Sequence, residues 1–144
     1  MIVSMEIKVK KLHPEAKLPS YAHSGDAGMD LYALEDAEVL PGQVAKVRSG
    51  LSFELPEGHV GLCWDKSGVS ANHKIKTLSG VLDAGYRGEL LMCVINLGSE
   101  AHIFNKGDKV LKMLIQKVEH PEIIEVSELT ETARGDGGFG STGK

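Results

Sequence analysis

Short apolar stretches separated by turn residues run through the chain and leave little room for long helices. Two of them, 5–9 and 51–55, alternate apolar and polar residues with the period of a half-buried strand. Three others, 60–64, 90–97 and 110–118, are more continuously apolar. Proline and glycine mark the turns between them, at Pro41-Gly42, Pro56-Glu57-Gly58, Leu97-Gly98 and Lys106-Gly107-Asp108. This spacing predicts an all-β fold, either an antiparallel sandwich, a barrel or a jelly roll.

The length of 144 residues predicts one domain with a short tail. One short helix is expected at 67–73, capped by Ser67, although Gly68 weakens it. From Arg134 the sequence becomes rich in glycine and cannot bury a core. We therefore expect a β-barrel domain over 1–133 and a mobile C-terminal arm over 134–144.

Charge and cysteine usage narrow the partners of this chain. The net charge is −4, and its Lys and Arg residues are spread out, which argues against a nucleic-acid-binding surface. No apolar run approaches the length that spans a membrane. Cys63 and Cys93 lack a metal-binding spacing and are expected to be reduced, buried residues of a cytoplasmic protein. An isolated nucleotide stays a candidate ligand.

The segment from Gly80 to Leu91 places three chemically useful side chains in one turn. Apolar residues flank the turn, and Gly85 and Gly88 permit positive φ, so a hairpin is expected. Asp83, Tyr86 and Arg87 would then supply a base, a flat platform and an anion clamp to one ligand. The alternative is an ordinary turn with solvated charges.

The glycine-rich arm has the composition of a phosphate-binding lid. Its backbone N–H groups can surround phosphate oxygens, and Arg134 adds a bidentate fork. Ser141 and Thr142 add hydroxyl donors, and Phe139 could stack on a base. It is not a Walker A loop, because the Lys-Ser/Thr ending is missing. The alternative is a disordered terminus.

Five motifs in order resemble the trimeric dUTPase family. They are Ala27–Ala33 (AGMDLYA), Lys66-Ser67-Gly68, the segment from Gly80, the stretch from Gly107 (GDKV) and the arm from Arg134 to Gly143. The resemblance implies a jelly-roll-like subunit in a homotrimer, with sites at subunit interfaces and the arm delivered from a neighbour. It also implies hydrolysis of dUTP to dUMP and pyrophosphate with Mg²⁺, by water attacking the α-phosphorus. Such an enzyme keeps uracil out of DNA and supplies dUMP for dTMP synthesis.

The resemblance assigns roles to the segment at 80–92. Asp83 corresponds to the carboxylate that activates water, and Tyr86 to the residue beneath the deoxyribose that leaves no room for a 2′-hydroxyl. The family reads uracil largely through backbone groups of this segment, so Gly80 and Met92 count among the implied substrate-binding residues.

Other motifs are implied to bind the phosphates. Asp30 corresponds to the acidic residue of the first motif, which helps to place a magnesium-bound water or the surroundings of the catalytic aspartate. Its alternative is a turn Asp at the start of a strand. Residues implied to contact substrate are Lys66, Ser67, Gly68, Lys112, Arg134, Phe139, Gly140, Ser141 and Thr142. Magnesium would be held mainly by the substrate phosphates.

Three positions depart from the family pattern. Asp65 and Lys66 stand where many relatives have Pro-Arg, and Lys112 stands where many have Gln. Because the charge changes cancel, we expect Asp65 and Lys112 to pair on adjoining strand ends, with Lys66 facing the triphosphate.

Two rival functions stay open. A dCTP deaminase of the same fold needs a catalytic Glu at the position of Arg87 and lacks this type of arm. A non-catalytic nucleotide-binding regulator could lose Asp83, Tyr86 or the arm, and all are present. Trp64, at the end of an apolar run, is expected in the core.

Overall fold

The computed structural model describes residues 4–143, where eleven short strands and one helix follow one another. The strands are β1 (Lys8–Lys11), β2 (Met29–Tyr32), β3 (Ala37–Val39), β4 (Val44–Arg48), β5 (Leu51–Glu54), β6 (His59–Asp65), β7 (Ile75–Thr77), β8 (Val81–Leu82), β9 (Leu91–Asn96), β10 (His102–Phe104) and β11 (Lys109–Lys117). The helix is α1 (Ser67–His73). The prediction of an all-β chain is confirmed. Residues 1–3 and 144, at the ends of the two expected segments, lie outside the described residues.

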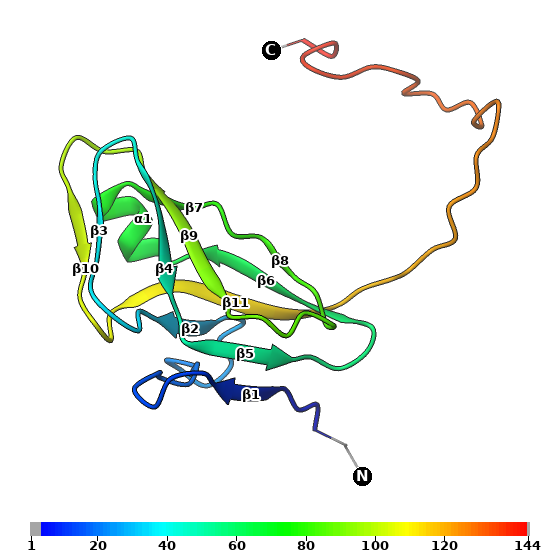
Figure 1. Ribbon diagram of the computed structural model, residues 1–144. Helices are drawn as coiled ribbons and strands as arrows, with labels where there is room; N and C mark the ends of the chain where they lie inside the picture. Colours follow the sequence, from blue (N-terminus) through cyan, green and yellow to red (C-terminus); the bar gives the residue numbers. More distant parts are fainter. Residues whose placement is uncertain (1–3, 144) are drawn as a thin grey trace.

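The strands form antiparallel sheets that connect distant parts of the sequence (Figure 1). The largest sheet has the order β2-β11-β6-β8, and a second has the order β4-β9-β7. Strands β1 and β5 pair with each other, as do β10 and β3. β11 lies at the centre and pairs with β6 from Leu111↔Asp65 to Lys117↔His59. Because most neighbours are not consecutive, the chain crosses repeatedly between layers.

Alternating side chains of the two main sheets meet in one hydrophobic core. Met92 and Val94 of β9 and Leu111 and Met113 of β11 are at most 1% exposed, and all four belong to the same buried cluster. Alternation along a strand places every second residue on the core face. The core therefore sits between the layers and holds the strand ends that carry the candidate site.

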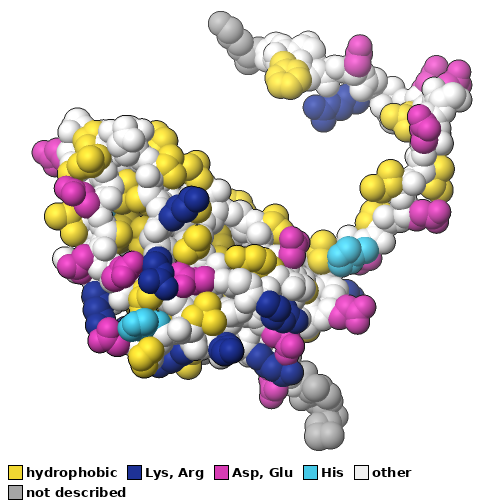
Figure 2. All heavy atoms as spheres, viewed as in Figure 1, with side chains coloured by type: hydrophobic (Ala, Val, Ile, Leu, Met, Phe, Trp, Pro, Cys, Tyr) yellow, Lys and Arg dark blue, Asp and Glu magenta, His cyan; other side chains and the backbone are white. Residues whose placement is uncertain are grey.

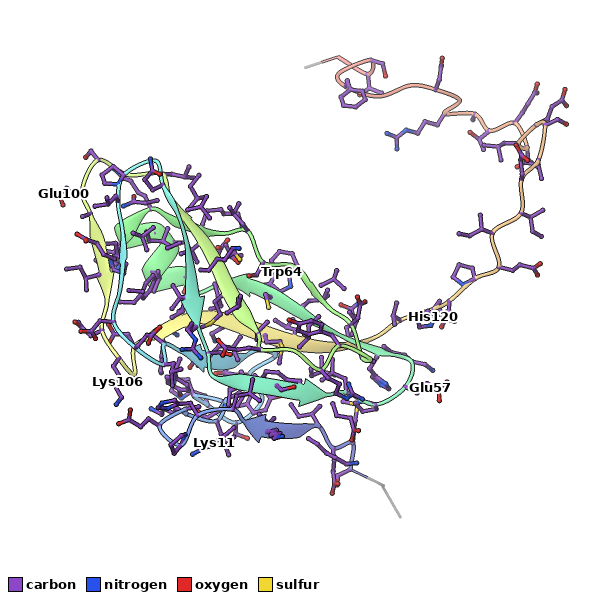
Figure 3. All side chains as sticks on the ribbon, in the orientation of Figure 1. Lys11, Glu57, Trp64, Glu100, Lys106 and His120 are labelled. Atoms are coloured by element: carbon purple, nitrogen blue, oxygen red, sulfur yellow. The ribbon has the colours of Figure 1, made fainter. Side chains whose placement is uncertain are left out.

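Several local predictions were wrong. Strand β5 is not half-buried, because Ser52 donates to the carbonyl of Arg87 and Leu90 N–H to that of Leu51, so the 83–90 loop covers it. Trp64 is 56% exposed and projects from β6, since its neighbour Cys63 takes the core face (Figure 3). Helix α1 is not capped by Ser67: Lys66 occupies the N-cap position, without a side-chain hydrogen bond.

The segment from Gly80 to Leu91 is not a hairpin. β8 pairs with β6, whereas β9 pairs with β4 and β7, so the segment crosses from one sheet to the other. Neither Gly85 nor Gly88 has a positive φ. Gly88 is required for another reason, because a Cβ there would overlap the ring of Tyr86.

After β11 the chain leaves the body as an extended segment, residues 119–143. His120 marks the point of departure, and no helix or strand follows in this range (Figures 1 and 3). The extension thus begins well before Arg134, where the composition changes. Its apolar side chains are exposed, namely Ile123, Ile124, Val126 and Leu129 (Figure 2). Among the described residues, no helix is long and apolar enough to cross a membrane.

Candidate active site

Asp83 and Tyr86 line one cavity at the end of β8. The cavity has a volume of about 260 Å³, and Gly80 and Cys63 form part of its wall. Tyr86 N–H donates to the carbonyl of Asp83 at 3.1 Å, and the Tyr86 hydroxyl donates to the carbonyl of Glu89 at 3.0 Å. The loop at 83–90, which we call the Asp83 loop, therefore holds an exposed carboxylate beside an aromatic ring.

Two residues assigned to ligand contact in this region have other positions. The Arg87 guanidinium donates to the carbonyls of Ala84 at 2.7 Å and Phe53 at 3.3 Å, so it braces the Asp83 loop and is not an anion clamp. Met92 is fully buried in the core, since it lies on the inward face of β9. Its side chain therefore cannot contact a nucleotide.

A buried carboxylate joins the first, second and fourth motifs. Asp30 of β2 is 1% exposed; its Oδ1 lies 3.1 Å from Lys66 Nζ, and its Oδ2 lies 3.2 Å from Lys109 Nζ. Burial alone would raise the pKa of Asp30, but the two lysines outweigh it and hold the pKa below its ordinary value. We call this group the Asp30 cluster. The expectation that Lys66 faces a triphosphate is wrong for this chain alone, because its ammonium points inward to Asp30.

The expected pair of Asp65 with Lys112 does not form. Asp65 lies opposite Leu111 and Lys112 opposite Trp64, so the two charges point to opposite faces of the sheet. The Asp65 carboxylate instead accepts from Lys76 Nζ at 2.5 Å and from the backbone N–H of Thr77 at 2.7 Å. Asp65 therefore fixes β7 against β6.

The described residues offer no preformed metal centre. Within 4–143, no three His, Cys, Asp or Glu side chains gather as metal ligands. Asp30 is the only acidic residue to which the motifs assigned a metal, and both of its oxygens face ammonium groups. The chain itself thus does not fit direct coordination of Mg²⁺ by Asp30.

The phosphate-binding candidates lie apart from the Asp83 cavity. Ser67 and Gly68 are exposed at the start of α1. In the arm, Arg134 Nε donates to the carbonyl of Gly137 at 3.0 Å, and Phe139 has a φ of 52° and is fully exposed. The arm, with Gly140, Ser141 and Thr142, extends away from the body (Figure 1). One chain therefore presents three separate groups: the Asp83 cavity, the Asp30 cluster and the arm.

Sequence reasoning missed three residues of this region. Lys109 lies inside the fourth motif, but only the fold shows that it reaches Asp30. Arg48 and Glu89 form an ion pair between β4 and the Asp83 loop, across 41 positions of sequence. No local pattern signals such a contact, because the pairing partner is set by the sheet topology.

Comparison with known proteins identifies the family. The dUTPase family model matches residues 14–143. Deoxyuridine 5′-triphosphate nucleotidohydrolases of Mycolicibacterium gilvum and Corynebacterium glutamicum are 43% and 45% identical to this chain, covering 98% and 96% of it and 97% and 95% of theirs. A dUTPase mutant of Staphylococcus bacteriophage 80alpha, solved with dUpNHpp, has a TM-score of 0.87 at 28% identity and covers 96% of this chain and 99% of that one.

This chain belongs to the dUTPase family, whose members hydrolyse dUTP to dUMP. The jelly-roll-like fold and the enzyme class expected from the five motifs are confirmed. A dUTPase from phage phi11 of S. aureus, with a TM-score of 0.80 at 27% identity over 85% of this chain and 97% of that one, is described as coordinating a structural Mg(II) ion.

Proposed function

We propose that this protein hydrolyses dUTP to dUMP and pyrophosphate, with Asp83 as the base that activates the attacking water. The observation that carries the proposal is the cavity shared by Asp83 and Tyr86, in a chain that matches dUTPases along its length. The carboxylate of Asp83 is exposed, so a water can reach it. A positioned general base contributes on the order of 10² to 10⁴ in rate.

Tyr86 is proposed to select the sugar. Its ring lies beside Asp83, and its hydroxyl is held by the Glu89 carbonyl, so the ring cannot easily swing away. A ring packed beneath deoxyribose leaves no room for a 2′-hydroxyl and would exclude UTP. Backbone groups between Gly80 and Met92 would read uracil, without the buried Met92 side chain.

The functional unit is proposed to be a homotrimer with sites at subunit interfaces. The three separate groups in one chain support this, because no single chain brings the arm to the Asp83 cavity (Figure 1). The exposed residues Ile123, Ile124, Val126 and Leu129 support it as well. Burial of one large apolar side chain is worth about 1.5–3 kcal/mol, so a partner surface for this segment is favourable.

The triphosphate would be bound by groups from several chains. We assign Ser67, Gly68 and Lys112 to one side, and Arg134, Phe139, Gly140, Ser141 and Thr142 to a mobile arm that closes over the ligand. Mg²⁺ is proposed to arrive on the substrate phosphates, because the Asp30 carboxylate is occupied by Lys66 and Lys109. The two free cysteines support the proposal of a cytoplasmic location.

A panel of nucleotides tests this function. The protein is incubated with Mg²⁺ and dUTP, UTP, dTTP or dCTP, and pyrophosphate and ammonia are measured. We expect pyrophosphate from dUTP alone and no ammonia. Ammonia from dCTP would indicate a deaminase, which nothing favours here because the Arg87 side chain is bound to backbone carbonyls. Binding of dUTP without product would indicate a regulator.

A further inference from the structure

A bidentate ion pair ties the Asp83 loop to strand β4. Arg48 Nε donates to Glu89 Oε2 at 3.1 Å, and Arg48 Nη2 donates to Glu89 Oε1 at 2.9 Å. The Glu89 side chain is 16% exposed, whereas that of Arg48 is 45% exposed. Paired, parallel bonds of this kind fix orientation as well as distance. The second acidic neighbour of Arg48, Glu35, is 3.9 Å away and offers a much weaker contact.

The same glutamate holds Tyr86 through its backbone. The Tyr86 hydroxyl donates to the Glu89 carbonyl at 3.0 Å. Arg48 therefore fixes the side chain of a residue whose main chain fixes the ring of Tyr86. In the described part of the chain, no other hydrogen bond to the Tyr86 hydroxyl is present.

The end of the loop has separate anchors that do not need Arg48. Ser49 Oγ donates to the Leu90 carbonyl at 2.6 Å, and Leu90 N–H donates to the Leu51 carbonyl at 2.9 Å. Loss of the ion pair would thus leave the main chain at Leu90 in place. What it frees is Glu89, whose largely buried carboxylate would turn toward water and carry its carbonyl with it.

We propose that Arg48 is a positioning residue for sugar discrimination, acting through Glu89 on the ring of Tyr86. The inference rests on the proposed role of Tyr86 in excluding a 2′-hydroxyl. A ring held to within a fraction of an ångström rejects one extra oxygen, whereas a ring free to tilt admits it. The effect belongs to selectivity, because the pair is partly exposed and the loop keeps its other anchors.

The test measures kcat/KM for dUTP and UTP in Arg48→Met and Glu89→Gln. Each variant should lower the dUTP/UTP ratio by about three- to tenfold, mostly through a gain on UTP. Arg48→Lys, which keeps the charge and loses the fork, should be intermediate. The double variant should match the single ones, because both remove the same contact. Lys106→Met, which removes an exposed pair with Glu15, is the matched control and should leave the ratio unchanged.

Two further variants separate the inference from the function on which it rests. Tyr86→Phe removes only the hydroxyl and should lower the ratio as Arg48→Met does; it also serves if Arg48→Met fails to fold. If Tyr86→Ala relaxes discrimination while Arg48→Met, Arg48→Lys and Tyr86→Phe do not, the positioning role is refuted and the proposed function stands. If Tyr86→Ala also leaves the ratio unchanged, both are overturned.

Discussion

Replacing Asp30 by asparagine should destabilise the fold by about 2 kcal/mol. Breaking a fully buried ion pair costs about 3–5 kcal/mol, whereas a surface pair contributes about 0–1 kcal/mol. Asp30 is 1% exposed, but the side chains of Lys66 and Lys109 are 24% and 42% exposed. Both ammoniums can therefore turn to water when the carboxylate is removed, which places the cost between the two limits.

Urea titration at pH 7, followed by circular dichroism, measures this loss. Wild type, Asp30→Asn and the control Asp136→Asn, on the exposed arm, are compared at one protein concentration, because the stability of an oligomer depends on concentration. The control should unfold like wild type. A loss below about 0.5 kcal/mol in Asp30→Asn, within the range of ordinary surface substitutions, would refute the reasoning.

The same variant gives a pH signature. The folded-state pKa of Asp30 is lowered, so its stabilisation is present above the unfolded value of about 3.9 and is lost as pH falls through the folded value. The difference in stability between wild type and Asp30→Asn should therefore shrink below about pH 4. A difference that stays constant into more acidic solution would show that the lysine contacts do not act through the charge.

Three other predictions concern separate parts of the molecule. Asp83→Asn should lower kcat for dUTP at least about 100-fold with an unchanged melting temperature, because Asp83 is exposed; near-normal turnover would remove it as the base. A chain ending at Ala133 should keep its melting temperature within about 2 °C yet lose at least about 100-fold in turnover, and full activity would exclude a lid. In a double-mutant cycle, Asp65→Asn and Lys112→Gln should change KM for dUTP additively within about 0.5 kcal/mol, since they lie on opposite sheet faces; stronger coupling would restore the pair.

Strand positions could be predicted because alternation is local. The apolar stretch at 110–118 corresponds to β11, and 60–64 lies within β6. Which strands pair is not a local property, and this is where prediction ended. The segment from Gly80 to Leu91 has the glycines of a hairpin, but β8 finds β6 and β9 finds β4 and β7. A crossover between sheets buries more apolar surface here than a hairpin in one sheet.

The site was predictable in its residue types and not in its contacts. Asp83 and Tyr86 were identified from one short motif, and they share a cavity. Lys66 was expected to face a phosphate, but a buried carboxylate attracts it more strongly than open water does. Such partners come from strands far apart in sequence, so only the fold could show that Lys109 completes the Asp30 cluster.

A mixing experiment tests most directly whether the active site is shared between chains. Full-length Asp83→Asn and a chain ending at Ala133 are each expected to be inactive as homotrimers. Co-refolded in equal amounts, they should recover activity, because Asp83 of the truncated chain can meet the arm of the other. With random assembly, about a quarter of the sites should hold both parts and turn over dUTP. A mixture that stays as inactive as its two components, while size measurements show mixed trimers, would contradict a site built from more than one chain.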